Sequence, residues 1–471
     1  MEVFMRDVDC RSPNPILDSL NEQQQAAVLN TRGPMLVLAG AGTGKTTVIT
    51  RRIAHLIASG VKPEQILAMT FTKKAALEMK QRVESSFDET LDRLTICTFH
   101  ALGFRLLRET NVRTTSSGRV RVISAKQQRE LVGLLLQRTG LADRFAIPEA
   151  IRQIGRTKTQ AALGESRSNC PEFDRMVVEY QQQLRELNHV DFDDLLILPL
   201  QTLENSPTLR KGYQQQWRYI LVDEYQDTNE LQHRLVQLLV GPERNLFVVG
   251  DDDQSIYGFR GASADKMLNF RHEFPGAQII KLEQNYRSTA EIIDLANSVI
   301  RHSLQRYRKT LRSHVGRGGL VSQRQAKDAE SESESIVDWM EQRRRTARWS
   351  DMAALFRVNS DAQSLRRRLN ERRIPYQSSG DSDPTKDSVT IMTLHRSKGL
   401  EFPIVFLPAV EENTLPHFHA IRNGTNGIEE ERRLFYVGIT RAREELVLSS
   451  CSTRHGRPRT TSRFLTELAN Q

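Results

Sequence analysis

The first candidate for chemistry is a glycine-rich run that follows an apolar stretch. It comprises Ala39, Gly40, Ala41, Gly42, Thr43, Gly44, Lys45 and Thr46. Glycines let backbone N–H groups close around a phosphate, and the N-terminus of the following helix favours the anion. We expect Lys45 to reach the β and γ phosphates of a nucleoside triphosphate and the Thr46 hydroxyl to hold Mg²⁺. Ala39 stands where the commonest pattern has its first glycine.

Two adjacent carboxylates form the second candidate. Asp223 and Glu224 follow residues 219–222, which have the apolar pattern of a buried strand. Parallel sheets bind ligands at the carboxyl ends of their strands, so we expect Asp223 to hold Mg²⁺. We expect Glu224 to orient and deprotonate an attacking water. An acidic pair after a strand is common by itself, but together with the glycine-rich loop it predicts a hydrolysis site.

Short β-rich runs, each followed by a helical or loop segment, must position these residues. The first set is residues 35–38, 65–70, 219–222 and 246–249, and the second set is residues 278–282, 353–357, 390–394, 404–407 and 445–449. Strands that alternate with helices predict parallel sheets covered on both faces. We therefore predict an α/β protein with two such units.

Two further segments have helical patterns. Residues 108–195 have helical periodicity and little strand signal, which predicts a helical insertion. Residues 328–335 alternate acids with serines ahead of an apolar stretch. Acids and serines favour the first turn of a helix, so we expect a helix start there and not a disordered linker.

Composition excludes two classes of protein. The 471 residues suggest about three domains or subdomains. With 67 basic and 58 acidic residues the net charge is +9, and 27% charged with 38% hydrophobic residues excludes an acidic disordered chain and a membrane-embedded one. Basic residues gather at 301–312, 341–373 and 454–463. Each run alone is typical of a solvated face, and together they favour a polyanionic partner.

Apolar runs and cysteines point to a cytoplasmic protein. The apolar runs fall far short of the roughly 18 residues of a membrane span, and residues 1–15 have no apolar signal-peptide core. The four cysteines are Cys10, Cys97, Cys170 and Cys451. No two have the short spacing of a zinc or redox site, so we expect reduced structural thiols.

Ten segments follow one another in the order of the superfamily 1 helicase motifs. They are residues 20–24, 39–46, 70–72, 98–100, 191–196, 223–227, 250–262, 284–288, 393–402 and 436–443. On these segments the chain resembles the UvrD/Rep/PcrA group of superfamily 1A DNA helicases, from about Leu20 to Leu468. The resemblance implies two RecA-like P-loop domains that bind ATP and Mg²⁺.

The resemblance also implies roles around the base and ribose of the nucleotide. Gln24 is similar to the glutamine that reads the adenine edge, and Tyr286 to the aromatic residue that stacks on the base. Glu401 is similar to the acid near the ribose. Thr47 stands where the family usually has an arginine that packs on adenine, which implies weaker base specificity or nucleotide affinity.

At the phosphates, the resemblance adds one sensor and two arginines. Gln254 is similar to the γ-phosphate sensor that links the nucleotide to the strand-binding face. Arg287 and Arg441 resemble the two arginine fingers of the second lobe. A guanidinium on a transferring phosphoryl group is worth roughly 10³ to 10⁵ in rate.

A single-stranded DNA track is implied as well. Four aromatic residues resemble those that stack on bases or separate them in the family: Phe71, Phe99, Tyr257 and Phe259. Seven other residues resemble those that contact phosphates or bases: Thr72, Thr98, His100, Arg260, Arg357, His395 and Lys398. Aromatic rings interleaved with cations suit sequence-tolerant binding of a single strand. Phe259 stands where tryptophan is common and offers a smaller ring.

One departure from the family is large. After residues 374–376 the family inserts a subdomain called 2B of well over a hundred residues, and here only residues 377–389 intervene. We therefore expect subdomain 1A in residues 1–107 and 196–276, helical 1B in 108–195, 2A in 277–471, and no 2B. Because 2B tends to regulate unwinding in the family, duplex separation by this chain alone is in doubt.

Two functions remain open at this stage. The first is a DNA-stimulated ATPase that acts as a translocase and helicase on single-stranded DNA and 3′-tailed duplexes, with 3′ to 5′ polarity by resemblance. The alternative is an ATP-gated DNA-binding or sensing subunit that recruits a nuclease or repair partner, like the helicase subunits of bacterial defence systems. The absence of 2B favours the alternative, and the complete set of hydrolysis residues favours the first.

Overall fold

The computed structural model describes residues 16–87, 90–110, 120–165, 170–378 and 386–469. By their contacts the residues form two compact units. Unit 1 comprises Met1–Met35, Val48–Glu224 and Thr228–Val248. Unit 2 comprises Leu36–Thr47, Tyr225–Asp227 and Val249–Gln471.

The first sheet is parallel where its pairing is resolved. Its order is β3 (Thr95–Thr98), β2 (Ile66–Thr70), β6 (Tyr219–Val222), β7 (Leu246–Gly250), β1 (Met35–Ala39) and β8 (Gln278–Leu282). Thr70 pairs with Thr98, Met69 with Val222, and Val222 with Val248. Strands β1, β2 and β7 are buried along their whole length, as continuous apolar runs in parallel sheets usually are.

Helices accompany these strands along the chain. They are α1 (Glu22–Leu29), α2 (Lys45–Ala58), α3 (Lys73–Glu84), α4 (Phe99–Glu109), α8 (Asp194–Asn205), α9 (Pro207–Gln216), α10 (Glu230–Leu239), α11 (Asp265–Leu268) and α12 (Phe270–Glu273). The expected strands of the first set are confirmed. Strand β8 was expected in the second set and instead forms an edge of the first sheet, and β3 was not predicted because its residues, Thr-Ile-Cys-Thr, do not form a continuous apolar run.

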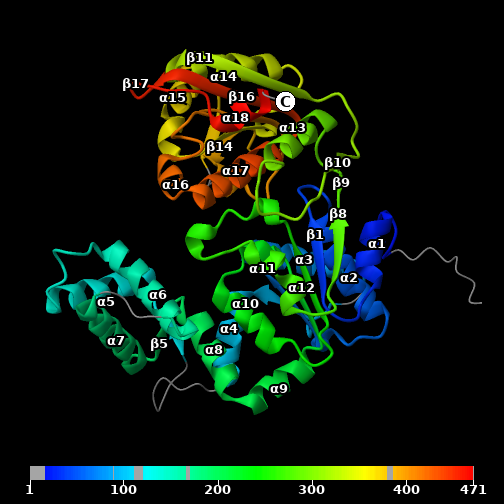
Figure 1. Cartoon of the computed structure of the whole chain (residues 1–471), viewed down its shortest axis with the longest axis vertical. Helices are drawn as coiled ribbons and strands as arrows, with labels where there is room; N and C mark the ends of the chain where they lie inside the picture. The colour runs from blue at the N-terminus through cyan, green and yellow to red at the C-terminus, as the bar shows by residue number, and fades with distance from the viewer. Residues whose placement is uncertain (1–15, 88–89, 111–119, 166–169, 379–385, 470–471) are drawn as a thin grey trace, which may run out of the picture. The chain divides into compact units, whose positions relative to one another are not determined.

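A group of three helices extends from unit 1 (Figure 1). It consists of α5 (Ala125–Arg138), α6 (Ile147–Leu163) and α7 (Pro171–Glu186). Leu135, Ile154 and Met176 pack in its own hydrophobic core. The two-stranded pairing of β4 (Arg121–Val122) with β5 (His189–Val190) lies at the chain entry and exit of this group. The helical nature expected for this stretch is confirmed in its described residues.

Unit 2 contains a second parallel sheet. Its order is β11 (Leu320–Asp328), β16 (Ala442–Arg454), β15 (Phe402–Leu407), β12 (Met352–Phe356), β14 (Val389–Thr393) and β13 (Tyr376–Ser378), with β17 (Arg457–Pro458) antiparallel to β16. A small parallel pair joins β9 (Gln284–Asn285) to β10 (Arg312–Ser313). The expected strands of the second set, β8 excepted, are confirmed within one to three residues at their starts.

Helices cover both faces of this second sheet. They are α13 (Ala290–Ile300), α14 (Ala329–Arg343), α15 (Gln363–Glu371), α16 (Phe418–Arg422), α17 (Thr425–Ile439) and α18 (Arg463–Ala469). One hydrophobic cluster packs Ile293 of α13 and Val437 of α17 against Val405 of the sheet. A separate cluster packs Val337 of α14 and Leu365 of α15. Two apolar layers on one sheet are the arrangement that alternating strands and helices predict.

The helix start expected in residues 328–335 is confirmed. Asp328 caps α14, and its Oδ1 accepts a hydrogen bond of 2.8 Å from Ser331 N. Strand β11 directly before it was not predicted, because most of its side chains are polar and exposed or half-buried. An edge strand of this kind lacks the apolar pattern that identifies buried strands.

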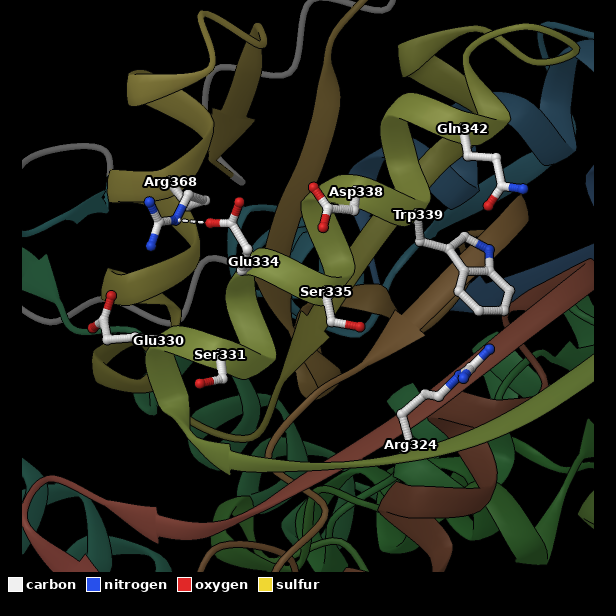
Figure 2. A pocket seen from close by; sticks show the side chains of 9 residues that line it. All are labelled: Arg324, Glu330, Ser331, Glu334, Ser335, Asp338, Trp339, Gln342 and Arg368. Atoms are coloured by element: carbon white, nitrogen blue, oxygen red, sulfur yellow. Dashed lines mark ion pairs between the residues drawn. The ribbon is translucent and has the colours of Figure 1, made fainter.

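The arginine-rich residues 341–373 are largely paired within unit 2. Arg368 of α15 contacts Glu334 of α14 at 2.5 Å, and Arg372 pairs with Glu334 and with Asp338 at 3.3 Å. A hollow of about 740 Å³ lies beside this ion-pair row. Figure 2 shows Glu334 directed toward Arg368, and Trp339 farther along the same helix, above Arg324. The acids of α14 therefore neutralise part of this run, and its preference for a polyanionic partner stays a prediction.

The structure bears on two expectations, one about membrane-spanning helices and one about the cysteines. None of the helices in the described ranges has the length and apolar character that crossing a membrane requires. Cys97, Cys170 and Cys451 are free thiols, whereas Cys10 lies outside the described residues. Burial raises the pKa of the Cys97 thiol to about 11, so this thiol stays protonated at neutral pH.

Candidate nucleotide and nucleic-acid sites

The glycine-rich loop lies between β1 and α2. Gly42 and Gly44 have φ angles of 65° and 85°, the left-handed region that side chains with a Cβ rarely adopt. A Cβ at residue 42 would lie 2.6 Å from Asn285 Nδ2, so this position also lacks room for a side chain. The Thr43 hydroxyl donates to Gly40 O at 2.9 Å and closes the turn.

Asn285, the last residue of β9, and Tyr286, which follows it, bind the backbone of this loop. Asn285 Nδ2 donates to Ala41 O at 2.6 Å, and Tyr286 N donates to Gly42 O at 2.9 Å. Asn285 Oδ1 accepts from Arg287 N at 2.9 Å. The side chain of Asn285 is fully buried, and our sequence reasoning gave it no role. Its position inside the Gln-Asn-Tyr-Arg-Ser segment was the available signal.

The nucleotide-base candidates differ in exposure. Tyr286 is 36% exposed, and its ring lies 4.9 Å from that of His314, so one aromatic face is accessible beside the loop. Gln24, in unit 1, is buried at the first turn of α1. Its Oε1 accepts from Asn21 N at 3.0 Å in a reciprocal capping box. Gln24 thus has a fixed side-chain orientation.

The two candidate arginine fingers are engaged in unit 2. Arg287 forms an ion pair with Glu401 and donates to Thr440 O at 3.1 Å. Arg441 is 2% exposed and donates to Val437 O at 2.9 Å and to Leu400 O at 3.0 Å. Glu401, expected near the ribose, is therefore also the partner of Arg287 in this conformation.

A buried network surrounds the candidate phosphate sensor. Gln254 Nε2 donates to Asp251 Oδ2 at 2.6 Å, and Asp251 N donates to Gln226 Oε1 at 2.9 Å. The pKa of Asp251 is lowered because the charges of Lys309 and Lys45 outweigh the effect of burial. Lys45 of the loop is thus electrostatically linked to the segment that carries Gln254.

Lys309 is the cation at the centre of three consecutive carboxylates. Its Nζ lies 3.0 Å from Asp251, 2.5 Å from Asp252 and 2.6 Å from Asp253. Arg306 adds an ion pair of 2.6 Å with Asp253. Burial lowers the pKa of Lys309, but the three carboxylates reverse this and hold it well above the usual value. Our sequence reasoning missed Lys309, which lies 56 residues away along the chain from Asp253.

Asp223 and Glu224 directly follow the last residue of β6, in unit 1. Asp223 is 6% exposed, and its Oδ1 accepts from Glu224 N at 3.0 Å. Glu224 has a φ of 51°, a strained conformation for a residue with a side chain. Strain of this kind is characteristic of functional sites, where the surrounding structure maintains it.

Two predicted DNA contacts in unit 1 are helix caps. Thr72 Oγ1 accepts from Ala75 N at 3.1 Å at the start of α3, and Thr98 Oγ1 accepts from Ala101 N at 3.2 Å at the start of α4. The first turns of both helices lack acidic residues. Both helix N-termini follow the carboxyl ends of neighbouring strands, which favours an anion.

The aromatic candidates of unit 1 divide into two groups. Phe71 is half-buried beside Thr72. Phe99 is 2% exposed, because its ring packs into the core at the first turn of α4. A base could stack on this ring only if the ring left the core, so the expected role of Phe99 as a stacking partner or spacer stays a prediction. Sequence alone could not separate this ring from an exposed one.

His100 stacks on a residue that our site prediction omitted. Its ring centroid lies 3.9 Å from that of Phe192, at an interplanar angle of 22°. Phe192 is 61% exposed, and burial lowers the pKa of His100 to about 4. Lys158 holds the carboxylates of Asp191, directly before Phe192, at 2.7 Å and of Asp194, two residues after it, at 2.6 Å. The acidic residues around Phe192 in the sequence were the available signal for exposure.

An aromatic and basic cluster lies on unit 2. Phe259 is 63% exposed, and its ring lies 5.9 Å from Tyr257 and 5.7 Å from His395. The Arg260 guanidinium lies 5.1 Å from the Tyr257 ring and 5.5 Å from the Phe259 ring. Burial, followed by the charge of Arg357, lowers the pKa of His395 to about 4. These four predicted contacts, Tyr257, Phe259, Arg260 and His395, are brought together.

Two other predicted contacts have intramolecular partners. Arg357 pairs with Glu431 at 2.8 Å. Lys398 is 8% exposed, lies 2.6 Å from Asp227 and donates to Gln254 O at 2.7 Å. The ammonium of Lys398 is paired with a carboxylate in this structure, and its expected contact with a DNA phosphate or base stays a prediction. Lys398 joins the acidic segment after β6 to the segment of Gln254.

Glu430 of α17 fixes the turn that presents Phe259. Its Oε1 accepts from Gly258 N at 3.0 Å. A Cβ at residue 258 would lie 2.7 Å from Glu430 Oε2, so a side chain at this position would displace the Glu430 carboxylate. The neighbouring Arg433 donates to Ser255 O at 2.8 Å. Our sequence reasoning did not identify Glu430.

The residues present fit a magnesium nucleotide. Positive φ angles at Gly42 and Gly44 turn the loop as a phosphate cradle requires, and Lys45 follows at the helix N-terminus. The hydroxyl of Thr46 and the carboxylate of Asp223 are hard oxygen donors, which Mg²⁺ prefers. A parallel sheet with this loop, followed by a second parallel sheet, defines a two-lobed P-loop nucleoside triphosphatase.

Comparisons with known families agree with this class. The model of the UvrD/REP helicase N-terminal domain matches residues 20–275, which is more than half of the chain. The model of the UvrD-like helicase C-terminal domain matches residues 280–383 and 377–453. The chain therefore belongs to the UvrD/REP helicase family. The family expected from the motifs and the α/β fold with parallel sheets are confirmed.

Curated relatives carry the name ATP-dependent DNA helicase PcrA. The protein of Leuconostoc citreum is 38% identical over 380 residues, which cover 78% of this chain and 51% of the relative. The chain thus spans about half the length of that relative. The proteins of Staphylococcus epidermidis and Staphylococcus aureus are 30% and 28% identical over 633 residues, which cover 97% of this chain and 87% of each relative.

Proposed function

We propose that this protein is an ATP-dependent single-stranded-DNA translocase and DNA helicase with 3′ to 5′ polarity. One observation carries the proposal: a short backbone segment holds both the buried Gln254 and, three residues later, Tyr257 of the exposed aromatic cluster. A shift of Gln254 on binding or losing a γ-phosphate would be transmitted directly to the rings on which bases stack. Family membership supports the same coupling.

Hydrolysis would use residues from the loop and from the end of β6. Lys45 binds the β and γ phosphates, and Glu224 orients the attacking water and accepts its proton. Thr46 and Asp223 would hold Mg²⁺, which would supply charge neutralisation at the phosphates. Backbone N–H groups of Gly42 to Thr46 complete the phosphate cradle.

Arg287 and Arg441 would serve as arginine fingers after a change of partners. Arg287 would exchange Glu401 for the transferring phosphoryl group, and Arg441 would give up one of its carbonyl contacts. Each change of partner would place a guanidinium where negative charge develops on the phosphoryl group. Tyr286 and Gln24 would hold the adenine by stacking and by hydrogen bonding.

Lys398 would couple the two ends of the hydrolysis site. It contacts Asp227, four residues after Asp223, and the carbonyl of Gln254. Movement of the acidic segment during hydrolysis would reach the aromatic cluster through this ammonium.

A strand-displacement experiment tests the proposed activity and polarity. With ATP and Mg²⁺, we expect the protein to release the labelled strand of a 3′-tailed duplex and to leave a 5′-tailed duplex intact. The matched control is Glu224→Gln, which should bind the same substrate without displacing a strand. Release from the 5′-tailed duplex alone would contradict the polarity.

A second candidate function is an ATP-gated DNA-binding subunit that recruits a nuclease or repair partner. The observation that favours it is the connection of β13 to β14, where only residues 379–388 link two neighbouring strands. The two matches to the C-terminal domain model meet at residues 377–383, and the 633 aligned positions of the Staphylococcus relatives exceed the 471 residues here. These matches support the absence of the 2B insertion.

The two functions make different predictions in one assay. A helicase displaces the strand as a purified protein, whereas a sensing subunit hydrolyses ATP on single-stranded DNA and displaces nothing. Translocation without displacement can be followed by the release of streptavidin from a biotinylated 3′ or 5′ end. Release of streptavidin without duplex separation would favour the translocase that needs a partner.

A further inference from the structure

Helix α16 presents three exposed side chains that suit nucleic-acid binding. Phe418 is 39% exposed, and His419 and Arg422 are exposed as well. The rings of Phe418 and His419 lie 3.9 Å apart, and the Arg422 guanidinium lies 5.6 Å from the Phe418 ring. Among the described residues no carboxylate lies within ion-pair distance of Arg422. The helix therefore offers an aromatic surface beside an uncompensated cation.

This group of side chains rests on a rigid support. His417, directly before α16, donates its backbone N–H to Glu431 of α17 at 2.9 Å. Helix α16 packs closely on α17, and a Cβ at Gly427 would collide with the carbonyl of Ala420. A surface that is fixed before a ligand arrives loses little conformational entropy on binding. Exposed Phe418 thus has a defined position and is not a freely moving surface residue.

The group adjoins the aromatic cluster of Tyr257, Phe259 and His395. Burial lowers the pKa of His395 and His417, and the charge of Arg357 lowers both further. Two consecutive residues of α17 anchor the two surfaces: Glu430 binds Gly258 N, and Glu431 binds Arg357 and His417 N. The two aromatic surfaces are therefore neighbours on one unit and have a common support.

We propose that Phe418, His419 and Arg422 form a second stacking platform for a single-stranded nucleic acid. The proposal rests on the proposed function and extends it to residues that the predicted strand track did not include. Phe418 and His419 offer faces on which any base can stack, and Arg422 neutralises the backbone phosphate. Paired bases in a duplex do not offer these faces, so the platform selects unpaired strands.

Oligonucleotide length separates this platform from the first. We measure binding of fluorescein-labelled oligo(dT) from 4 to about 20 nucleotides by anisotropy, with wild-type protein and with Phe418→Ala. Base stacking is worth about 1 to 3 kcal/mol, so the Kd of long oligonucleotides should rise about 5- to 150-fold in Phe418→Ala. The shortest oligonucleotides that bind occupy the first platform alone and should have equal Kd for both proteins.

Substitutions at the same position separate stacking from packing. Phe418→Trp should restore tight binding of long oligonucleotides, whereas Phe418→Leu, which keeps apolar volume without an aromatic face, should remain as weak as Phe418→Ala. The matched control is Val315→Ala, which truncates another exposed apolar residue of unit 2 and should bind like wild type. Restoration by leucine would show a packing role and overturn the proposal.

Two outcomes separate this inference from the proposed function. If single-stranded DNA stimulates ATP hydrolysis by the wild-type protein while Phe418→Ala binds every length like wild type, the second platform is wrong and the helicase proposal stands. If DNA neither binds nor stimulates the wild-type protein, the proposed function fails, and the platform fails with it. Equal weakening at all lengths would also overturn a platform that only longer strands reach.

Discussion

At the scale of residues, the two sites depend on charges and rings whose surroundings decide their role. Lys309 is surrounded by three carboxylates, and Lys398 is buried against one. Neither is available for a phosphate in this conformation. Phe259 and Phe192 are the opposite case, because they are more than half exposed in an otherwise well-packed protein. Exposed aromatic side chains of this size commonly mark binding surfaces.

The role of Glu224 can be tested by removing its charge while keeping its shape. Glu224→Gln should bind ATP with nearly unchanged affinity, while the hydrolysis rate falls by about 10² to 10⁴, since the amide cannot accept the proton of the attacking water. Binding is measured with a fluorescent nucleotide and turnover by phosphate release. Unchanged turnover would remove Glu224 from the base role.

Lys309 should be essential for stability. In Lys309→Met three buried carboxylates lose their shared cation, and breaking a buried ion pair from one side costs about 3 to 5 kcal/mol of unfolding free energy. Urea unfolding measures this loss. The control is Lys327→Met, which removes an exposed lysine and should change the unfolding free energy by less than about 0.5 kcal/mol. Equal stability of both variants would contradict the account.

Two histidines make stability depend on pH in a defined direction. His100 and His395 have pKa values lowered to about 4, so the folded protein keeps them neutral where the unfolded chain, with a histidine pKa near 6.5, is protonated. Their contribution to stability is full above about pH 6.5 and is lost as pH falls toward about 4.

The measurement compares unfolding free energies at pH 7 and pH 5. His100→Gln should lose less stability between these pH values than the wild-type protein, because one of the two histidines that resist protonation is gone. An identical loss in both proteins would show that His100 titrates normally. An NMR titration midpoint of its imidazole near 6.5 would show the same.

At the scale of elements, α17 links the turn of Gly258, on the proposed strand-binding side of unit 2, to the contacts of Arg287, on the proposed nucleotide side. Glu430 holds the turn of Gly258, and Glu431 holds Arg357. Beyond its C-terminal end, Thr440 O accepts from Arg287. Because the helix is a stiff rod with buried apolar residues along its length, a displacement at one end is carried to the other. Rigid elements of this kind are suitable carriers of coupling.

Substitution of Glu430 tests its positioning role. Glu430→Ala removes the acceptor of Gly258 N–H, and one hydrogen bond is worth about 0.5 to 1.5 kcal/mol. We therefore expect the oligonucleotide concentration for half-maximal ATPase stimulation to rise about 2- to 10-fold, with nucleotide affinity unchanged. Glu430→Gln keeps an acceptor oxygen and should behave like wild type. If the glutamine variant is as impaired as the alanine variant, the hydrogen bond is not the cause.

Sequence patterns predicted most elements because most are buried on one or both faces. The continuous apolar runs of β1, β6 and β7 predicted buried strands. The capping signal at Asp328 predicted the start of α14. Strand β11 escaped prediction because most of its side chains are polar and exposed or half-buried, and because its backbone pairs with the distant β16. Pairing with a distant strand leaves no local pattern.

The order of the motifs predicted which residues form the site. It did not predict which of their side chains are buried. Motif order indicated where Phe99 and Lys398 occur in the chain but not that one ring is in the core and one ammonium is in an ion pair. Lys309 and Glu430 could not be found, because their partners are 56 and 172 residues away along the chain. Only the folded chain places these groups together.

At the scale of the whole molecule, ATP hydrolysis and the grip on a single strand are proposed to be one coupled process. The family and the fold are established by the matches to both helicase domains, and we propose that the short β13–β14 connection is this chain's main departure from the family. In this proposal, hydrolysis and translocation need the loop, the acidic pair and the aromatic cluster, and none of these depends on an inserted subdomain.

The most direct test of this coupling is the steady-state rate of ATP hydrolysis by the purified protein, measured over a range of concentrations of single-stranded oligo(dT). The account predicts a rate that rises with oligonucleotide concentration and reaches a plateau, with a half-maximal point that shifts to higher concentration in Phe259→Ala. A rate that stays the same with and without oligonucleotide would contradict it.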